Sequence, residues 1–144
     1  MASIFDVAKY ILESKGSMST WKLQKLCYYS QAWSIAWGDG SIFDEDFEAW
    51  SNGPVSPVLF AAHRGMFTIR AADLHEGNSA NLTRTAREDV DIVLRDYGDK
   101  EAYWLREQSH SEDPWRNARG DLPDGAVSHR KITKEAMGEY YGSL

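Results

Sequence analysis

The strongest constraint on the fold is a recurring pattern in which apolar residues follow a capping residue at helical spacing. The first instance runs from Ile4 to Leu12, with apolar side chains at i, i+3, i+4, i+7 and i+8, and it ends at Gly16. Ser3-x-x-Asp6 supplies a typical N-terminal capping pair. The pattern predicts a helix with one buried face.

A second helix is predicted to begin after Ser19, with Met18 and Leu23 at the spacing of a hydrophobic staple. It is expected to end at Gly38 or Gly40. Its predicted buried face comprises Leu23, Leu26, Cys27, Ser30, Trp33 and Trp37. We expect the first two helices to pack as an antiparallel hairpin, and Cys27 to be a buried, inert thiol.

Similar capping signals recur along the rest of the chain. The residues expected to start the later helices are Ser56, Thr85, Asp99, Ser111 and Thr133. Residues 42–50 and 66–69 suit loops or brief strands. With 144 residues and no repeat or linker, one domain is expected over residues 1–144. The predicted fold class is mainly α, a compact single-domain helical bundle of about six or seven helices with minor short β-strands.

The helical period fades between Ile42 and Trp50, and Asn52-Gly53-Pro54 predicts a turn. Four carboxylates lie between Asp44 and Glu48, and no basic residue occurs between Gly38 and Ala62. Such a run is often only a solvated loop. The flanking Phe47 and Trp50 favour a contact site, because interfaces combine aromatic anchors with a charged rim.

Composition narrows the function classes. The formal net charge of −6 makes nucleic acid unlikely as a ligand, because phosphate binding needs a clustered positive field. The one cysteine excludes an internal disulfide and fits the cytosol. The N-terminus has no basic region typical of a signal peptide, and no apolar run approaches the ~20 residues needed to span a bilayer. We therefore expect a cytoplasmic protein without a membrane partner.

Residues for catalysis or metal binding are sparse. No two of the four histidines have a metal-ligand spacing, and no glycine-rich phosphate loop or Gly-x-Ser-x-Gly elbow occurs. His110 lies close in sequence to Glu112 and Asp113, which suggests either acid–base chemistry or a simple tie between two helix ends. We favour the second reading and predict no catalytic residues, no metal and no cofactor. A small hydrolase or transferase using His110 and Glu112 is the alternative.

Three segments together resemble a known family. The first is Val7-Ala8-x-Tyr10-Ile11-Leu12 followed by the run from Lys22 to Trp33, KLQKLCYYSQAW. The second comprises Ile42-Phe43-Asp44-Glu45 and Ala49-Trp50-Ser51-Asn52-Gly53-Pro54-Val55, and the third runs from Leu105 to Trp115. In this order and spacing they resemble the Panacea domain, also called the SocA-like antitoxin domain, and its phage-associated relatives. Ser109 stands where the family usually has Thr.

The resemblance implies a mostly helical antitoxin that neutralises a cognate protein toxin by direct stoichiometric binding, the toxin being encoded next to it. It also implies two alternatives: a proteolysis adaptor that presents a toxin to a bacterial AAA+ protease and so touches a protease chaperone, and a phage accessory protein without an assigned role. Homo-oligomerisation stays open. The family pairs one domain type with many unrelated toxins, so the toxin class does not follow.

The predicted partner-binding residues are Phe47, Trp50, Asn52, Pro54, His110, Glu112, Trp115, Lys22 and Lys25. Two interpretations are open for the residues around Trp50 and His110. They either support the fold beside a variable contact surface, which we favour slightly, or form the contact patch themselves. The acidic loop Asp44–Glu48 and the aromatic helix from Trp21 to Trp37 are the candidate contact regions, and an acidic patch would speed association with a basic toxin at low salt.

Overall fold

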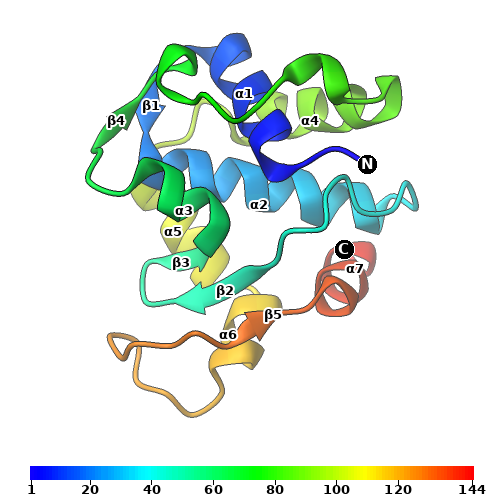
Figure 1. The fold of residues 1–144 in the computed structure, drawn as a ribbon. Coiled ribbons are helices and arrows are strands. Elements are labelled where there is room, and N and C mark those ends of the chain that lie inside the picture. The colour runs from blue at the N-terminus through cyan, green and yellow to red at the C-terminus, as the bar shows by residue number, and fades with distance from the viewer.

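The computed structural model describes residues 1–144 and contains seven α-helices with short strands between them (Figure 1). The helices are α1 (Ile4–Lys15), α2 (Thr20–Ala36), α3 (Pro57–His63), α4 (Arg84–Tyr97), α5 (Ala102–His110), α6 (Asp113–Arg119) and α7 (Lys134–Gly142). The strands are β1 (Met18–Ser19), β2 (Phe47–Trp50), β3 (Gly53–Val55), β4 (Thr68–Ile69) and β5 (Lys131–Ile132). Two 3-10 turns, Ala71–Asp73 and Ser79–Asn81, lie between β4 and α4. The predicted mainly α class is confirmed.

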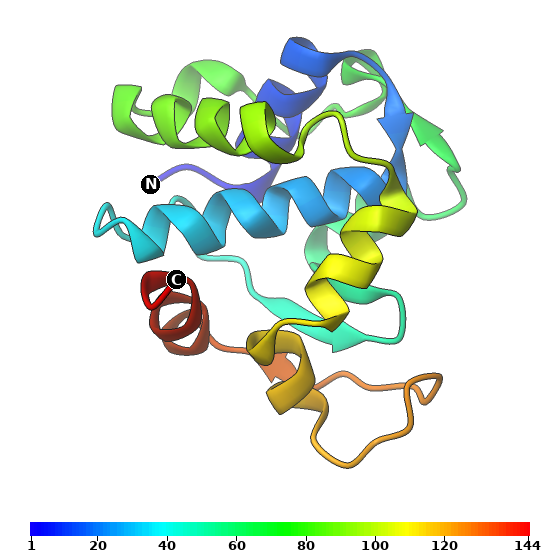
Figure 2. The same cartoon turned by 180° about the vertical axis from the view of Figure 1, so that it is seen from behind.

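Helix α2 runs through the middle of the molecule. Figures 1 and 2 show α1 and α4 on one side of it, and the β2–β3 hairpin, α6 and α7 on the other. Every residue from Leu23 to Ala32 is buried, so the single apolar face predicted for this helix is too narrow. The thiol of Cys27 is buried, as expected.

Two buried glutamines explain how α2 can lie at the centre of the molecule although it contains polar residues. Gln24 accepts a hydrogen bond from the Ser56 amide and donates one to the Ser56 carbonyl, at 2.8 and 3.2 Å. Gln31 does the same with the Ile42 amide and the Phe43 carbonyl, at 2.8 and 2.7 Å. Each side-chain amide therefore satisfies backbone groups that burial would otherwise leave unpaired.

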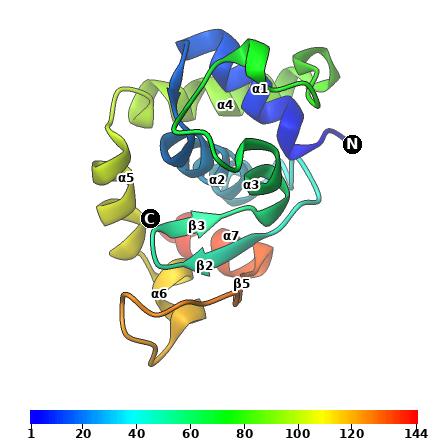
Figure 3. The same cartoon turned by 60° about the vertical axis from the view of Figure 1, so that its left-hand side comes forward.

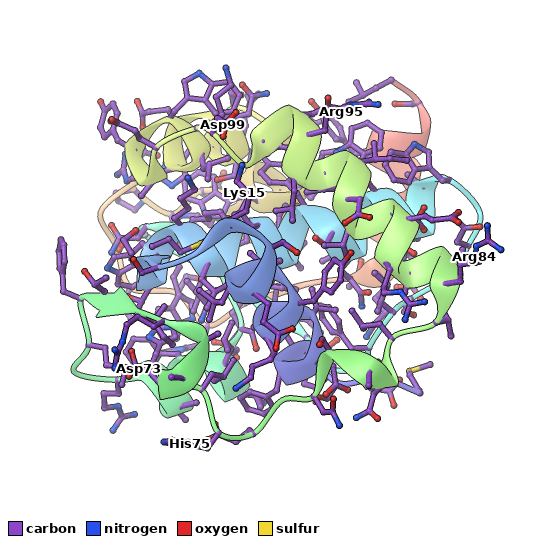
Figure 4. All side chains as sticks on the ribbon, turned by 90° about the horizontal axis from the view of Figure 1, so that it is seen from above. Lys15, Asp73, His75, Arg84, Arg95 and Asp99 are labelled. Atoms are coloured by element: carbon purple, nitrogen blue, oxygen red, sulfur yellow. The ribbon has the colours of Figure 1, made fainter.

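Helix α1 is capped as predicted: the Asp6 amide donates to Ser3, and the Asp6 carboxylate accepts from the Ser3 amide. The predicted antiparallel hairpin with α2 is wrong, because α1 crosses α2 steeply (Figures 1 and 4). The connection between the helices is drawn into a strand pair, β1 with β4. Figure 4 also shows Lys15 at the end of α1 pointing to Asp99, and their side chains form a 2.9 Å ion pair.

A three-stranded antiparallel sheet with the order β3-β2-β5 covers one side of α2 (Figure 3). In the β2–β3 hairpin Trp50 pairs with Gly53 and Ala49 with Pro54, so the turn is Ser51-Asn52 rather than the predicted Asn52-Gly53-Pro54. Gly53 has a φ of 110°, a backbone conformation that L side chains rarely adopt.

Capping predictions were only partly right. Ser56 and Thr133 cap α3 and α7 as expected. Helix α4 starts at Thr83 instead of Thr85, since Thr83 accepts a hydrogen bond from the Ala86 amide. Asp99 does not cap α5, whose N-cap residue is Glu101, and its carboxylate accepts a hydrogen bond from Lys15 instead.

One cluster of buried apolar side chains extends from Ile4 in α1 to Tyr141 in α7, so the helices share a single core. No helix is both long and apolar enough to cross a bilayer, and this includes α2, which is the longest.

Candidate functional site

The three sequence segments singled out above meet around Lys25 of α2. The Lys25 side chain is 1% exposed, and its ammonium group makes no hydrogen bond and no ion pair. It lies 5.3 Å from the centre of the Trp21 ring. Burial, together with the charge of Arg106, lowers the pKa of Lys25 to about 7. A lysine in this state is unusual, because buried cations are normally paired.

The β2–β3 hairpin closes over Lys25 through Gly53. A Cβ atom at Gly53 would lie 2.6 Å from Cε of Lys25 and 3.1 Å from the hydroxyl oxygen of Ser109. The positive φ therefore favours glycine here, and a side chain at this position would also displace the end of Lys25 and crowd Ser109. The first, second and third segments thus contact one another at this point.

A small surface cavity of about 160 Å³ opens beside Lys25. Its lining residues come from α2, the hairpin turn and α5, and they are Trp21, Lys25, Asn52, Ala102, Tyr103 and Arg106. Two basic side chains and two aromatic rings therefore share one cavity. Arg106 is half-buried and donates to Glu107 on its own helix. No acidic residue lines the cavity.

Glu112 lies in a second polar cluster, between α2, α5 and α7. One of its carboxylate oxygens accepts hydrogen bonds from the hydroxyls of Tyr29 and Tyr141, at 2.8 and 2.7 Å. The other oxygen accepts from the Gln108 amide at 3.0 Å. Burial raises the pKa of both tyrosines, which keeps them as protonated donors. A buried carboxylate with three donors holds these helices together.

Trp115 and His110 form a third connection. The Trp115 indole donates to the Trp50 carbonyl at 2.8 Å, which joins α6 to the end of β2. The His110 ring stacks on Trp115 with its centre 3.7 Å away. Burial and the nearby charge of Arg106 lower the pKa of His110 to about 4, so the ring is neutral at pH 7. Its Nε2 atom is buried without a partner.

Arg119 is an organising residue that the sequence interpretation missed. It is buried, lies over the Trp115 ring, and donates to the Ala49 carbonyl at 2.9 Å. Its other terminal nitrogen donates to three carbonyl groups of the following loop, those of Pro123, Asp124 and Ala126. The one available sequence signal was an arginine directly before a Gly/Pro-rich loop, which begins at Gly120.

The predicted binding residues differ in their access to solvent. Lys25, Phe47, Pro54, Glu112 and Trp115 are buried, whereas Asn52 is exposed. Trp50, His110 and Lys22 are half-buried. Phe47 packs against Tyr28 in the core, and Lys22 lies outside the lining of the cavity. In this conformation a partner can reach the site mainly through Asn52, the half-buried residues and the cavity.

The acidic run is largely occupied by contacts within the chain. Glu45 accepts from the Ile4 amide, and Asp46 pairs with Lys131 and Lys134. Although partial burial opposes it, hydrogen bonds from these lysines lower the pKa of Asp46. Glu48 accepts from the indole of Trp50 and lies 3.1 Å from a ring nitrogen of His129. Asp44 is the one exposed carboxylate of the four, so the run is not an open acidic patch.

The arrangement does not assemble an acid–base pair from His110 and Glu112, because Glu112 bonds to Tyr29, Tyr141 and Gln108 instead. No group of three or more His, Cys, Asp or Glu side chains is placed to hold a metal ion. The largest cavity, about 580 Å³, lies elsewhere, between the start of the chain, the end of α2 and the start of α4. Nearby, burial and Asp39 raise the pKa of the Asp89 carboxyl to about 6.

These features define a class of protein. It is a mainly helical domain in which Trp115 and Glu112 connect the helices and the β2–β3 hairpin, and a cavity with basic and aromatic walls opens at its surface. The sequence matches the family described as "Antitoxin SocA-like, Panacea domain" over residues 23–116, about two thirds of the chain. The chain belongs to this family. No match was found among curated proteins or among solved structures. The matched range contains Lys25, Asn52, Arg106, Glu112 and Trp115, whereas Trp21 of the cavity and Tyr141 of the Glu112 cluster lie outside it.

Proposed function

We propose that the protein is the antitoxin of a bacterial or prophage toxin–antitoxin pair and neutralises its cognate protein toxin by direct, stoichiometric binding in the cytoplasm. Membership of the antitoxin family carries this proposal. Binding of this kind needs no catalytic group and no cofactor. We also propose that the whole of residues 1–144 forms the functional domain, since the core extends beyond the matched range in both directions.

The contact surface that we propose surrounds the N-terminal end of α2, and we call it the α2-end surface. It comprises Trp21, Asn52, Phe60, Phe67, Tyr103 and Arg106. Phe67 and Tyr103 are 79% and 69% exposed. Large exposed aromatic side chains next to a basic cavity are typical of protein contact sites, where Trp, Tyr and Arg provide most of the binding energy.

The elements of this surface adjoin one another. The Phe67 carbonyl accepts a hydrogen bond from the Thr20 amide at the start of α2, at 3.0 Å. The rings of Trp21 and Phe60 are 6.3 Å apart. We favour this surface over the acidic loop, because the carboxylates of the loop already bind groups of the chain itself.

A co-expression rescue tests the function. Each reading frame adjacent to the gene is expressed alone and together with this protein, and growth is scored. A neighbour that stops growth alone, and co-purifies with the protein when growth is restored, supports the proposal. If no neighbour is toxic, the antitoxin role is refuted. Rescue that is lost when a host AAA+ protease is deleted would indicate an adaptor instead.

Variants locate the interface. Phe67→Asp and Tyr103→Asp place a charge at exposed positions of the α2-end surface, so both should keep the fold and weaken toxin binding by at least tenfold. Arg84→Asp, at the start of α4 on another face (Figure 4), is the matched control and should bind normally. Equal binding by all three variants would place the interface elsewhere.

A further inference from the structure

We infer that the cavity between α2, the β2–β3 turn and α5 is a carboxylate-binding site, which takes an acidic side chain or the C-terminal carboxylate of the protein partner. The source of the carboxylate rests on the proposed function. The carboxylate preference itself rests on the contents of the cavity. Three observations support it: an unpaired buried ammonium group, an unbalanced local charge, and the size and chemistry of the walls.

The ammonium group of Lys25 lacks any partner although it is buried. Each ammonium group carries three donors, and leaving donors buried and unpaired is costly. Lysine has a flexible four-carbon stem, so its nitrogen can turn into the cavity that the same side chain lines. A carboxylate placed there would satisfy the donors and the charge together.

The local charge is opposite to that of the whole chain. The formal net charge is −6, with 22 acidic against 16 basic residues. Nevertheless the cavity contains Lys25 and Arg106 without an acidic lining residue. Glu107 pairs with one nitrogen of Arg106, and the guanidinium has five donors, so others stay free for a ligand. The cavity therefore favours a ligand with a negative charge.

The walls select the kind of anion. Trp21 and Tyr103 provide apolar faces, and Asn52 adds an amide at the rim. The volume of about 160 Å³ is below the roughly 300–1,000 Å³ of sites for drug-sized ligands. A single acidic side chain or a chain terminus, with an apolar stem and one charged end, fits these walls. The exposed Tyr103 beside the cavity would lie against the rest of the partner.

The test uses three small probes on the full-length protein: N-acetylglutamic acid α-amide, N-acetylalanine, and uncharged N-acetylalanine amide. The chemical shifts of ¹³Cε of Lys25 and of the Trp21 indole are followed by NMR, against sodium chloride at equal ionic strength. We expect saturable shifts with a carboxylate probe and none with the amide or chloride. Saturation by the first probe indicates an acidic side chain, and by the second a chain terminus. Shifts equal to those with chloride, or no shifts, overturn the inference.

Lys25→Met and Arg106→Gln should each lower the affinity for the carboxylate probe at least tenfold. Arg106 is half-buried, so Arg106→Gln tests the cavity a second time without changing a fully buried side chain. Lys100, an exposed residue in the connection between α4 and α5, provides the control, and Lys100→Met should bind the probe normally. If the toxin binds both cavity variants with unchanged affinity, the toxin is refuted as the source of the carboxylate, while the antitoxin proposal stands. If the probes bind but no adjacent frame is toxic, the site stands and the antitoxin proposal falls.

Discussion

Replacing Lys25 by methionine should stabilise the fold, and the gain should shrink as the pH rises. Burial and Arg106 lower the pKa of Lys25 from 10.5 to about 7. The folded protein therefore disfavours the charged form, while the unfolded chain does not. At about 1.36 kcal/mol per pH unit, this corresponds to at most about 5 kcal/mol below pH 7. Methionine has a similar length and no charge, so it keeps the packing and removes the cost.

The sign follows from proton linkage. Below pH 7 Lys25 is charged in both states, and the folded protein bears the full cost. Between pH 7 and 10.5 the unfolded chain binds more protons than the folded one, so the stability of the wild type rises with pH. Over the two pH units from 7 to 9 the rise attributable to Lys25 is roughly 2–3 kcal/mol. The other titratable groups near Lys25, His63 and His110, have lowered pKa values and stay neutral in this window.

The assay compares urea and thermal unfolding of wild type and Lys25→Met at pH 6, 7, 8 and 9. The stability difference should fall by roughly 2–3 kcal/mol between pH 7 and 9, or about 5–10 °C in Tm for a domain of this size. Lys100→Met gives the baseline for losing an exposed ammonium group. A difference between Lys25→Met and wild type that does not change with pH would refute the reasoning, because it would mean that the ammonium group is compensated in the folded state.

Two further substitutions test the contacts around the site. In urea unfolding, Gly53→Ala should destabilise the fold by about 1–3 kcal/mol more than Gly65→Ala. Both glycines have a positive φ, but only at Gly53 does the new Cβ meet Lys25 and Ser109. Equal losses of stability in the two variants would show that the hairpin does not press on Lys25. Glu112→Gln should lower the stability of the fold by about 1–3 kcal/mol, because glutamine has no charge and cannot accept hydrogen bonds from Tyr29, Tyr141 and Gln108 together. The exposed control Glu107→Gln should change the stability by no more than about 0.5 kcal/mol. An unchanged Tm for Glu112→Gln would show that Glu112 does not link the helices.

Local signals in the sequence were enough for the elements but not for their arrangement. Apolar spacing and the caps at Ser3, Ser56 and Thr133 predicted helices that the structure contains. The path of α1 could not be predicted, because it depends on the pairing of β1 with β4, about 50 residues apart in the chain. Asp99 was assigned to a cap because its neighbours in sequence suggested one, yet its partner is Lys15.

The polar residues of α2 were the least predictable part. Periodicity treats Gln24 and Gln31 as solvent-facing, although both are buried and bonded to backbone groups of distant segments. Of the residues predicted for the site, Lys25 and Asn52 line the cavity, whereas Trp115 bonds to the end of β2 and His110 stacks on its ring. Their role in binding a partner stays a prediction. What the sequence could not indicate was which of them support the fold and which face outward.

The geometry suggests different roles for the two groups of residues: the buried ones hold the fold together, and the exposed ones are available for contact. The Trp115 indole bonds to the Trp50 carbonyl, and the Glu112 carboxylate accepts from Tyr29 of α2. Changing Trp115 or Glu112 would therefore disturb the fold first. Under the proposed function, a buried link of this kind would not touch the toxin and so would not select it. Phe67 and Tyr103 are exposed on the same scaffold, so substitutions there would change the surface without removing a buried contact. Lys25 links the two groups, since it is held in the core and yet lines a surface cavity. If the proposed contact surface is correct, the exposed residues Phe67 and Tyr103 would determine which toxin binds, and the charge of Lys25 would supply a common contact for a carboxylate.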